Sequence, residues 1–411
     1  MESKTLQFAR RGRRLIGQEM FKVLERAKKI ERYGQRVYHL ELGNSSFPPP
    51  STVIQTTIES LSNGHLGYVP SSGHPDLRAA LAQHYAEGGR PWITEKYFVI
   101  SPANLLINQV LDMTCNEGDV LVVFTPAFPT YIAAAEYIGL TLKAIALESE
   151  KGYHLTKQAI DQAVALKPKA LIINSANNPT GAVYTHSSLE YLIQQCDRYG
   201  IWVLSDETYA DLCYRWPYWS LSALEYRQLI VLSSFSKSYA IPGYRTGYAL
   251  AHPTVASKLS LSCSTLFSCL PLFTQEGCVA ALKVGESYLQ EVCDHYSYIT
   301  EHCAEIINQS GVLTCSVPEA AFYLFIDITQ TKLSDHEFCR RLLQEWHTAV
   351  TPGSSFGPGL EKYVRVSVSG QKEDVLEGIR RLVEFSLHCK DGRPWLSSAD
   401  TTPLRKVSHA V

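Results

Sequence analysis

The sequence predicts an α/β fold in which a mostly parallel sheet lies between layers of helices. Short apolar runs recur along the first two thirds of the chain, at 97–100, 120–124, 170–174, 202–206 and 229–233. Their polar and apolar residues do not alternate, which is typical of strands buried on both faces of a parallel sheet. The stretches between them suit crossover helices, at 104–116, 129–137 and 187–199.

A second domain is expected because 411 residues exceed what one hydrophobic core usually serves. After about residue 290 the pattern changes to a long helix, two short strands and a final helix, at 286–310, 322–326, 363–367 and 373–388. We therefore expect a large domain, a small α+β domain and a polar tail, over residues 46–290, residues 1–45 with 291–390, and residues 391–411.

The composition argues against several classes of partner. The chain has 38 basic and 40 acidic residues, so it carries no net field that would attract nucleic acid or an anionic membrane. The basic stretch Arg10–Arg14 is better explained as a solvated helix start than as a nucleic-acid patch. No apolar run reaches the roughly 18 residues of a membrane span, and the amino terminus lacks an apolar signal core.

The cysteines indicate neither a metal site nor a redox motif. There are 11 of them, and none forms a Cys-x-x-Cys pair. Most have apolar neighbours, as buried reduced thiols would have in a cytoplasmic protein. We therefore expect a cytoplasmic location and no bound metal.

Polar residues close the predicted strands at one edge of the sheet. These residues are Ser101, Thr125, Asn178, Asp206 and Ser234. Each is unremarkable alone, because turns need polar residues. Functional groups of open α/β sheets gather at the carboxyl ends of the strands, so five such residues together predict a site there.

Lys237 follows the strand at 229–233 and lies among hydroxyl side chains, in Ser233-Ser234-Phe235-Ser236-Lys237. A lysine that reaches the surface is one interpretation of this position. The other is an amine that forms a Schiff base, with a pKa lowered by its surroundings. The residue alone does not decide between them.

Four motifs, in order along the chain, resemble those of the class I/II aminotransferases. These enzymes belong to the aspartate aminotransferase superfamily, which depends on pyridoxal phosphate (PLP) and has fold type I. Ser234 to Lys237, with Arg245 eight residues further on, resembles the family's PLP-lysine motif. The other three are Asn178-Pro179-Thr180-Gly181, Asp206-Glu207-Thr208-Tyr209 and the strand with Arg365.

The resemblance implies a role for each matching residue. Lys237 would hold PLP as a Schiff base, and Asp206 would stabilise the protonated pyridine nitrogen. The other expected cofactor ligands are Asn178 and Tyr209 at the phenolic oxygen, Phe128 stacked on the ring, and Ala103, Asn104, Ser234 and Arg245 at the phosphate. The expected substrate ligands are Gly43 through its backbone and Arg365 through paired hydrogen bonds to the α-carboxylate.

A homodimer is also implied, because Tyr68 matches a tyrosine that reaches the phosphate in the partner subunit. Three of these residues have simpler interpretations. Asp206 would be a helix N-cap, Phe128 a core aromatic and Arg245 a surface residue.

Three departures from the family pattern lie on the expected substrate side. Ser101-Pro102 stands where many relatives have two glycines, and Asn44-Ser45-Ser46 follows Gly43 where many have Glu-Pro-Asp. Ala103 stands where some relatives have a basic residue that pairs with a side-chain carboxylate. Because an unpaired buried carboxylate is costly, we expect a donor that is not dicarboxylic.

The expected activity is amino-group transfer between an amino acid and a 2-keto acid, as part of amino-acid metabolism or biosynthesis. A PLP-dependent lyase, cyclase, γ-replacement enzyme or oxidase of specialised metabolism is the alternative on the same scaffold. A regulatory or binding protein that keeps the fold without catalysis is a third hypothesis.

Overall fold

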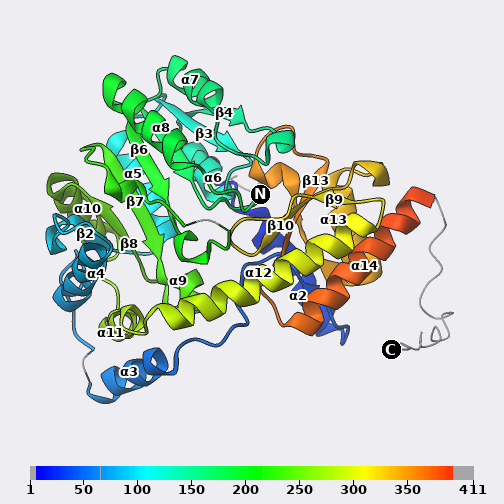
Figure 1. Cartoon of the computed structure of the whole chain (residues 1–411), viewed down its shortest axis with the longest axis horizontal. Coiled ribbons are helices and arrows are strands. Elements are labelled where there is room, and N and C mark those ends of the chain that lie inside the picture. Colours follow the sequence, from blue (N-terminus) through cyan, green and yellow to red (C-terminus); the bar gives the residue numbers. More distant parts are fainter. Residues whose placement is uncertain (1–5, 65, 216, 392–411) are drawn as a thin grey trace, which may run out of the picture.

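The computed structural model describes residues 6–64, 66–215 and 217–391 (Figure 1). Of the residues expected to form a polar tail, 391–411, Asp391 is instead the last residue of α14 (Lys372–Asp391), and 392–411 lie outside the described residues. A seven-stranded sheet forms the centre of the larger part, in the order β2-β8-β7-β6-β5-β3-β4. Its strands are β2 (Phe98–Ile100), β3 (Val120–Thr125), β4 (Thr141–Ala146), β5 (Ala170–Asn174), β6 (Trp202–Asp206), β7 (Leu229–Ser234) and β8 (Gly247–Ala251).

The expected α/β fold is confirmed, because β3 to β7 pair in parallel and helices cover the sheet (Figure 1). The helices of this part are α3 (Ser51–Ser62), α4 (Pro75–Glu87), α5 (Ala103–Thr114), α6 (Pro129–Ile138), α7 (Lys157–Ala165), α8 (His186–Tyr199), α9 (Phe235–Ser238), α10 (Pro253–Leu266) and α11 (Leu272–Leu282). Two apolar layers, one on each face of the sheet, seal these helices against it.

Two of the seven strands, β4 and β8, were not singled out from the sequence. β4 is an edge strand whose residues are exposed or half-buried, so its sequence is not continuously apolar. β8 runs antiparallel to both β7 and β2. Because β2 and β7 are both antiparallel to β8, β2 runs in the same direction as the parallel strands. All the polar strand ends expected to share one edge therefore do so.

A second, smaller region contains a four-stranded antiparallel sheet in the order β12-β13-β10-β9. Its strands are β9 (Thr314–Cys315), β10 (Tyr323–Asp327), β12 (Thr351–Pro352) and β13 (Tyr363–Ser367). A separate two-stranded sheet pairs β1 (Tyr38–His39) with β11 (Thr348–Ala349). The helices are α12 (Glu286–Gln309), α13 (Asp335–Trp346) and α14 (Lys372–Asp391), and Figure 1 shows α12 running from beside the large sheet to α14.

The amino-terminal segment connects the two regions. α2 (Glu19–Arg32) packs on the small region through Val23 and Ala27, which share a core cluster with Leu343 and Ala349. α1 (Arg10–Arg13) lies instead against the large region, where Arg10 and Arg14 form ion pairs with Glu117 at 3.1 and 2.8 Å. The basic stretch thus forms a helix paired with acidic groups.

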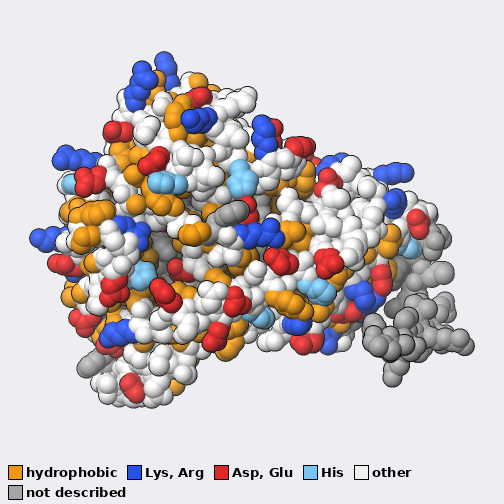
Figure 2. All heavy atoms as spheres, in the orientation of Figure 1, with side chains coloured by type: hydrophobic (Ala, Val, Ile, Leu, Met, Phe, Trp, Pro, Cys, Tyr) orange, Lys and Arg blue, Asp and Glu red, His pale blue; other side chains and the backbone are white. Residues whose placement is uncertain are grey.

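The surface carries mixed charge. Figure 2 shows Lys and Arg side chains interspersed with Asp and Glu over the visible face. Among the described residues, no helix has the length and apolar character that crossing a lipid bilayer requires. Within the same ranges, no group of three or more His, Cys, Asp or Glu side chains is placed to bind a metal ion.

Gly247 at the start of β8 is the point where the sheet approaches the start of α5 most closely. A Cβ atom there would lie 2.7 Å from the carbonyl oxygen of Ser233 and 3.2 Å from the backbone nitrogen of Ala103. Both contacts are with backbone, so neither neighbour is free to rotate away. We expect Gly247→Ala to lower the free energy of unfolding by about 1–3 kcal/mol, measured by thermal denaturation.

Gly243→Ala is the matched control, because no atom would lie within 4 Å of its added Cβ. An equal melting temperature for Gly247→Ala and Gly243→Ala would show that the close approach at β8 is not a real constraint.

Candidate active site

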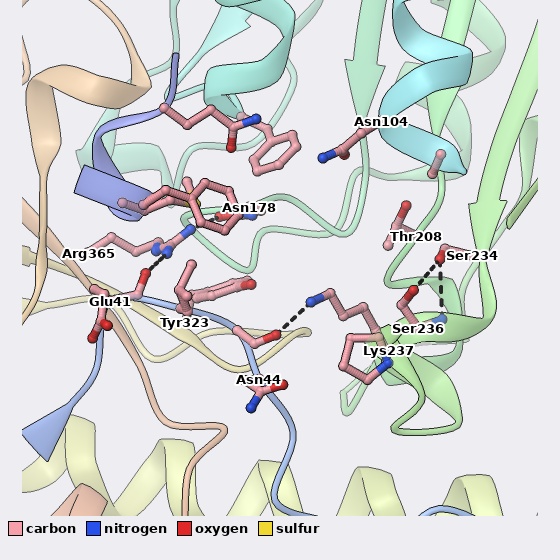
Figure 3. A pocket seen from close by; sticks show the side chains of 18 of the residues that line it. Glu41, Asn44, Asn104, Asn178, Thr208, Ser234, Ser236, Lys237, Tyr323 and Arg365 are labelled. Carbon is pink, nitrogen blue, oxygen red and sulfur yellow. Dashed lines mark hydrogen bonds between the residues drawn. The ribbon is translucent and has the colours of Figure 1, made fainter. Parts of the chain in front are cut away.

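A cavity of about 720 Å³ opens at the carboxyl edge of the large sheet, and residues of both regions line it (Figure 3). The large region contributes Ala103, Asn104, Phe128, Asn178, Asp206, Tyr209, Ser234, Lys237 and Arg245, and the small region with its amino-terminal segment contributes Gly43 and Arg365. All the expected cofactor and substrate residues except Tyr68 therefore line one cavity. Tyr68 is 92% exposed and lies outside it.

Lys237 lies in α9, one turn after the end of β7, and its amine points into the cavity (Figure 3). Its Nζ donates a hydrogen bond to the carbonyl oxygen of Gly43 at 2.6 Å. Burial, together with the nearby cations Arg365 and Arg245, lowers the pKa of this amine to about 8. Lys237 is thus not a lysine that reaches into bulk solvent.

Gly43 allows the close approach of three groups. A Cβ at this position would lie 2.1 Å from the hydroxyl of Tyr323 and 2.8 Å from the ring of Phe322. Its carbonyl oxygen is the acceptor for Lys237. A larger residue would therefore displace the backbone that holds the amine.

Arg365 lies on β13 and is 1% exposed. Its guanidinium donates to the carbonyl oxygen of Glu41 through Nη2 and to Oδ1 of Asn178 through Nη1, the latter at 3.2 Å. Its Nε is buried and has no hydrogen-bond partner among the described residues. Burial also lowers the pKa of the guanidinium. A buried cation with an unsatisfied donor suits a carboxylate ligand.

Asp206 ends β6 and is buried. Its Oδ2 accepts a hydrogen bond from the hydroxyl of Tyr131 at 2.6 Å, and its Oδ1 accepts from the hydroxyl and the N–H of Thr208 at 2.6 and 3.2 Å. The nearest following helix, η3 (Ala210–Leu212), begins four residues later, so Asp206 is not its N-cap. The carboxylate is held rigidly at the floor of the cavity.

Tyr209 and Asn178 are each held by hydrogen bonds. The hydroxyl of Tyr209 pairs with that of Tyr323 at 2.7 Å. The backbone N–H of Asn178 donates to Oδ1 of Asn174, whose Nδ2 in turn donates to the carbonyl oxygen of Asp206, both at 2.9 Å. This network ties the two loops to the ends of their strands.

An anion-binding turn begins at α5. Pro102 is its N-cap and provides no side-chain cap, so the first N–H groups, at Ala103 and Asn104, have no helical acceptor. Asn104 and Ser234 lie on the same side of Lys237 in Figure 3. Arg245 lines the same cavity and adopts a left-handed backbone conformation, with φ at 55°. Proline at 102 thus leaves two free N–H groups facing the cavity side of the turn.

Phe128 packs partly against the core and also lines the cavity. It precedes α6, lies edge-on to Tyr131 with ring centroids 5.7 Å apart, and packs partly against the core. It also lines the cavity. Phe128 therefore contacts the core and also borders the cavity.

The donor set fits PLP. The phosphate would meet the free N–H groups of α5, Ser234 and Arg245, and the pyridine nitrogen would meet the rigid carboxylate of Asp206. The amine of Lys237, with a pKa lowered to about 8, suits bond formation with an aldehyde. Asn178 and Tyr209 provide donors between these two ends.

Several cavity residues escaped the sequence analysis. Tyr323 was part of an apolar strand and gave no signal of its own. The others are Gln18, Met20, Phe21, Leu24, Lys28, His39, Glu41, Leu42, Asn174, Pro242 and Gly370. No separate signal marked α2, because Met20 and Leu24 continue the stripe of Val23 and Ala27 at helical spacing.

Comparisons with known proteins agree with this geometry. Residues 36–382 match the family model described as aminotransferase class I and II. An aspartate aminotransferase of Musicola paradisiaca is 28% identical, over 92% of this chain and 96% of the relative. The arginine–pyruvate transaminase of Pseudomonas aeruginosa is 26% identical, over 85% and 90%. The solved aspartate aminotransferase of Thermotoga maritima is 27% identical with a TM-score of 0.84, over 92% and 99%.

That match spans most of the chain and includes every motif around the cavity. The chain is therefore a member of the class I and II aminotransferases, PLP-dependent enzymes of fold type I.

Proposed function

We propose that this enzyme moves an amino group between an amino acid and a 2-keto acid in the cavity between Lys237 and Arg365. The observation that carries the proposal is the placement of two cations, the half-buried Lys237 and the buried Arg365, by one short segment. The carbonyl oxygen of Gly43 accepts from Lys237, and that of Glu41 accepts from Arg365. A substrate carboxylate on Arg365 would hold its Cα atom toward the amine of Lys237.

PLP, when bound, supplies an electron sink that weakens the Cα–H bond of the amino acid. We propose that Nζ of Lys237 accepts this proton as a general base and donates it again in a later step as a general acid. A pKa of about 8 leaves a useful fraction of the amine neutral near physiological pH. The proposed role thus matches the electrostatics of the buried amine.

The remaining cavity residues are proposed to bind and orient. Arg365 would grip the α-carboxylate, using the Nε that has no protein partner. Asp206 would provide the negative charge opposite the pyridine nitrogen, held by Tyr131 and Thr208. Phe128 would cover one face of the ring, which limits access of water.

The lyase, cyclase, γ-replacement or oxidase alternative is not favoured. The similar proteins reported above are named aminotransferases, and they match along most of the chain. Asn44 and Pro102 still differ from the family pattern on the expected substrate side.

The substrate is proposed not to be dicarboxylic, although several relatives are named aspartate aminotransferases. Ala103 offers no charge at the position where some relatives are basic. Lys28 and His39 also line the cavity, but Lys28 forms an ion pair with Glu31 at 2.7 Å, and His39 lies between Glu31 and Glu41. A second carboxylate would have to compete for these cations.

We further propose a homodimer with shared sites, a large domain at 46–290 and a small domain from 1–45 and 291–390. Exposure of Tyr68 outside its own cavity supports a role in the partner's site. The two separate sheets support the domain division. The cytoplasm is the proposed location, and it rests on the composition and on thiols such as Cys196 and Cys278, which are buried and free.

The proposed activity is tested with a panel of amino acids and 2-keto acids. We expect transfer of nitrogen to the acceptor without release of free ammonia, measured by separate assays for keto acid and ammonia. Lys237→Ala should lower this rate by roughly a thousandfold or more, because it removes the proton carrier. Lys258→Ala, an exposed lysine on α10, is the control.

Ammonia released without any acceptor would favour elimination over transfer. Full activity in Lys237→Ala would rule out the proposed role of the amine.

The rate at which the cofactor-free protein captures PLP should depend on pH. Only the neutral amine reacts, so the rate should rise with pH and level off above the pKa of about 8. Arg365→Gln removes a nearby positive charge, which raises the pKa of Lys237, so its midpoint should move to higher pH. Stopped-flow absorbance of PLP measures both profiles.

Arg227→Gln, on the surface of the large region, should leave the midpoint unchanged. A midpoint near 10, as for an ordinary lysine, would contradict the environment described for Lys237.

A shared site makes a prediction about mixed dimers. Tyr68→Ala and Lys237→Ala should each be impaired, for different reasons. Mixing the two under conditions that exchange subunits should restore activity, because one site of the mixed dimer has both Lys237 and a partner's Tyr68. No gain in verified mixed dimers, measured by the transfer assay, would remove Tyr68 from the partner's site.

A further inference from the structure

We infer that the amino acid substrate has a bulky apolar or aromatic side chain, and that this side chain packs against α2 at Met20, Phe21 and Leu24. The inference rests on the proposed function, since it concerns the substrate of the same cavity. The substrate class follows from the wall of the cavity that contains none of the expected cofactor ligands.

The apolar stripe of α2 is wide and has two adjoining faces, because Met20 lies three residues before Val23 and Leu24 lies three residues before Ala27. The first face packs into the small region through Val23 and Ala27. The second consists of Met20, Phe21 and Leu24, which line the cavity. None of these three belongs to a hydrophobic core cluster of the described residues. The second face therefore has the cavity as its apolar neighbour.

Exposure along this face indicates space for a ligand. Phe21 is 49% exposed and Leu24 is half-buried, although both border the cavity, while Met20 is buried. Exposed aromatic surface at the wall of a pocket gains free energy when an apolar ligand covers it. A small side chain such as that of alanine would leave this surface in water.

The charges around α2 disfavour a charged substrate side chain. Lys28 and His39 are each paired with carboxylates, as described above, so neither is free to receive an acidic group. The carboxylate of Glu41 is fully buried, accepts from His39, and points away from Lys237 in Figure 3. A basic side chain would therefore not reach it from the reacting centre.

The wall is fixed before any ligand binds. On one side α2 is held to the small region by its first apolar face. On the other, Nε2 of Gln18 donates to the hydroxyl of Thr130 on α6 at 2.9 Å, and Arg14 pairs with Glu117. Preorganised apolar contacts cost little ordering on binding, so they contribute to selectivity.

Unreactive carboxylates test the inference without requiring catalysis. Titration calorimetry of the PLP-loaded enzyme would compare 3-phenylpropanoate with succinate and with 5-(trimethylammonio)pentanoate, none of which has an amine that can react with PLP. We expect 3-phenylpropanoate to bind at least tenfold more tightly than either. Phe21→Ala and Leu24→Ala should each weaken its binding by about five- to tenfold, because each removes apolar area that the phenyl group covers.

Glu25→Ala is the matched control, because this exposed residue lies on the same helix but does not line the cavity. The variant should bind 3-phenylpropanoate with unchanged affinity. Tighter binding of succinate or 5-(trimethylammonio)pentanoate would overturn the inference, as would unchanged affinity for 3-phenylpropanoate in the Phe21→Ala, Leu24→Ala double variant.

The two failures are distinguishable. An enzyme that transfers nitrogen best from aspartate keeps the proposed function and loses this inference. One that binds 3-phenylpropanoate through α2 but transfers no nitrogen loses the proposed function alone.

Discussion

The site depends on placing two cations, the half-buried Lys237 and the buried Arg365, in one cavity without a carboxylate hydrogen-bonded to either. Each is held instead by a neutral carbonyl, and these carbonyls belong to Gly43 and Glu41 on the same extended segment. A carbonyl stabilises a cation less than a carboxylate does. Both groups are therefore kept available: Lys237 has a lowered pKa, and Arg365 keeps an unsatisfied donor.

The fold provides the rigidity that this arrangement requires. Parallel strands bring Asp206, Asn178 and Lys237 to one edge of the large sheet, although they are far apart in sequence. β13 brings Arg365 from the small sheet to the opposite wall. α2 then closes the remaining side through contacts with both regions. The cofactor side and the substrate side are thus built from different parts of the chain.

Much of this arrangement could be predicted from the sequence. Buried parallel strands appear there as apolar runs, and the four motifs occur in the same order as in the family. It did not reveal β4, whose edge position leaves it half-exposed, or the antiparallel direction of β8. Tyr323 was hidden among apolar strand residues, and only the folded chain shows its hydroxyl beside Tyr209. The cavity face of α2 was missed because only three-dimensional packing separates it from the face that meets the core.

The most direct test of the central claim is to locate the covalent attachment of the cofactor. The PLP-loaded protein would be reduced with borohydride, digested, and analysed by peptide mass spectrometry. We expect one pyridoxyl group per chain, on Nζ of Lys237. A pyridoxyl group on another lysine, such as Lys28 at the cavity wall, or no attachment at all, would contradict the account.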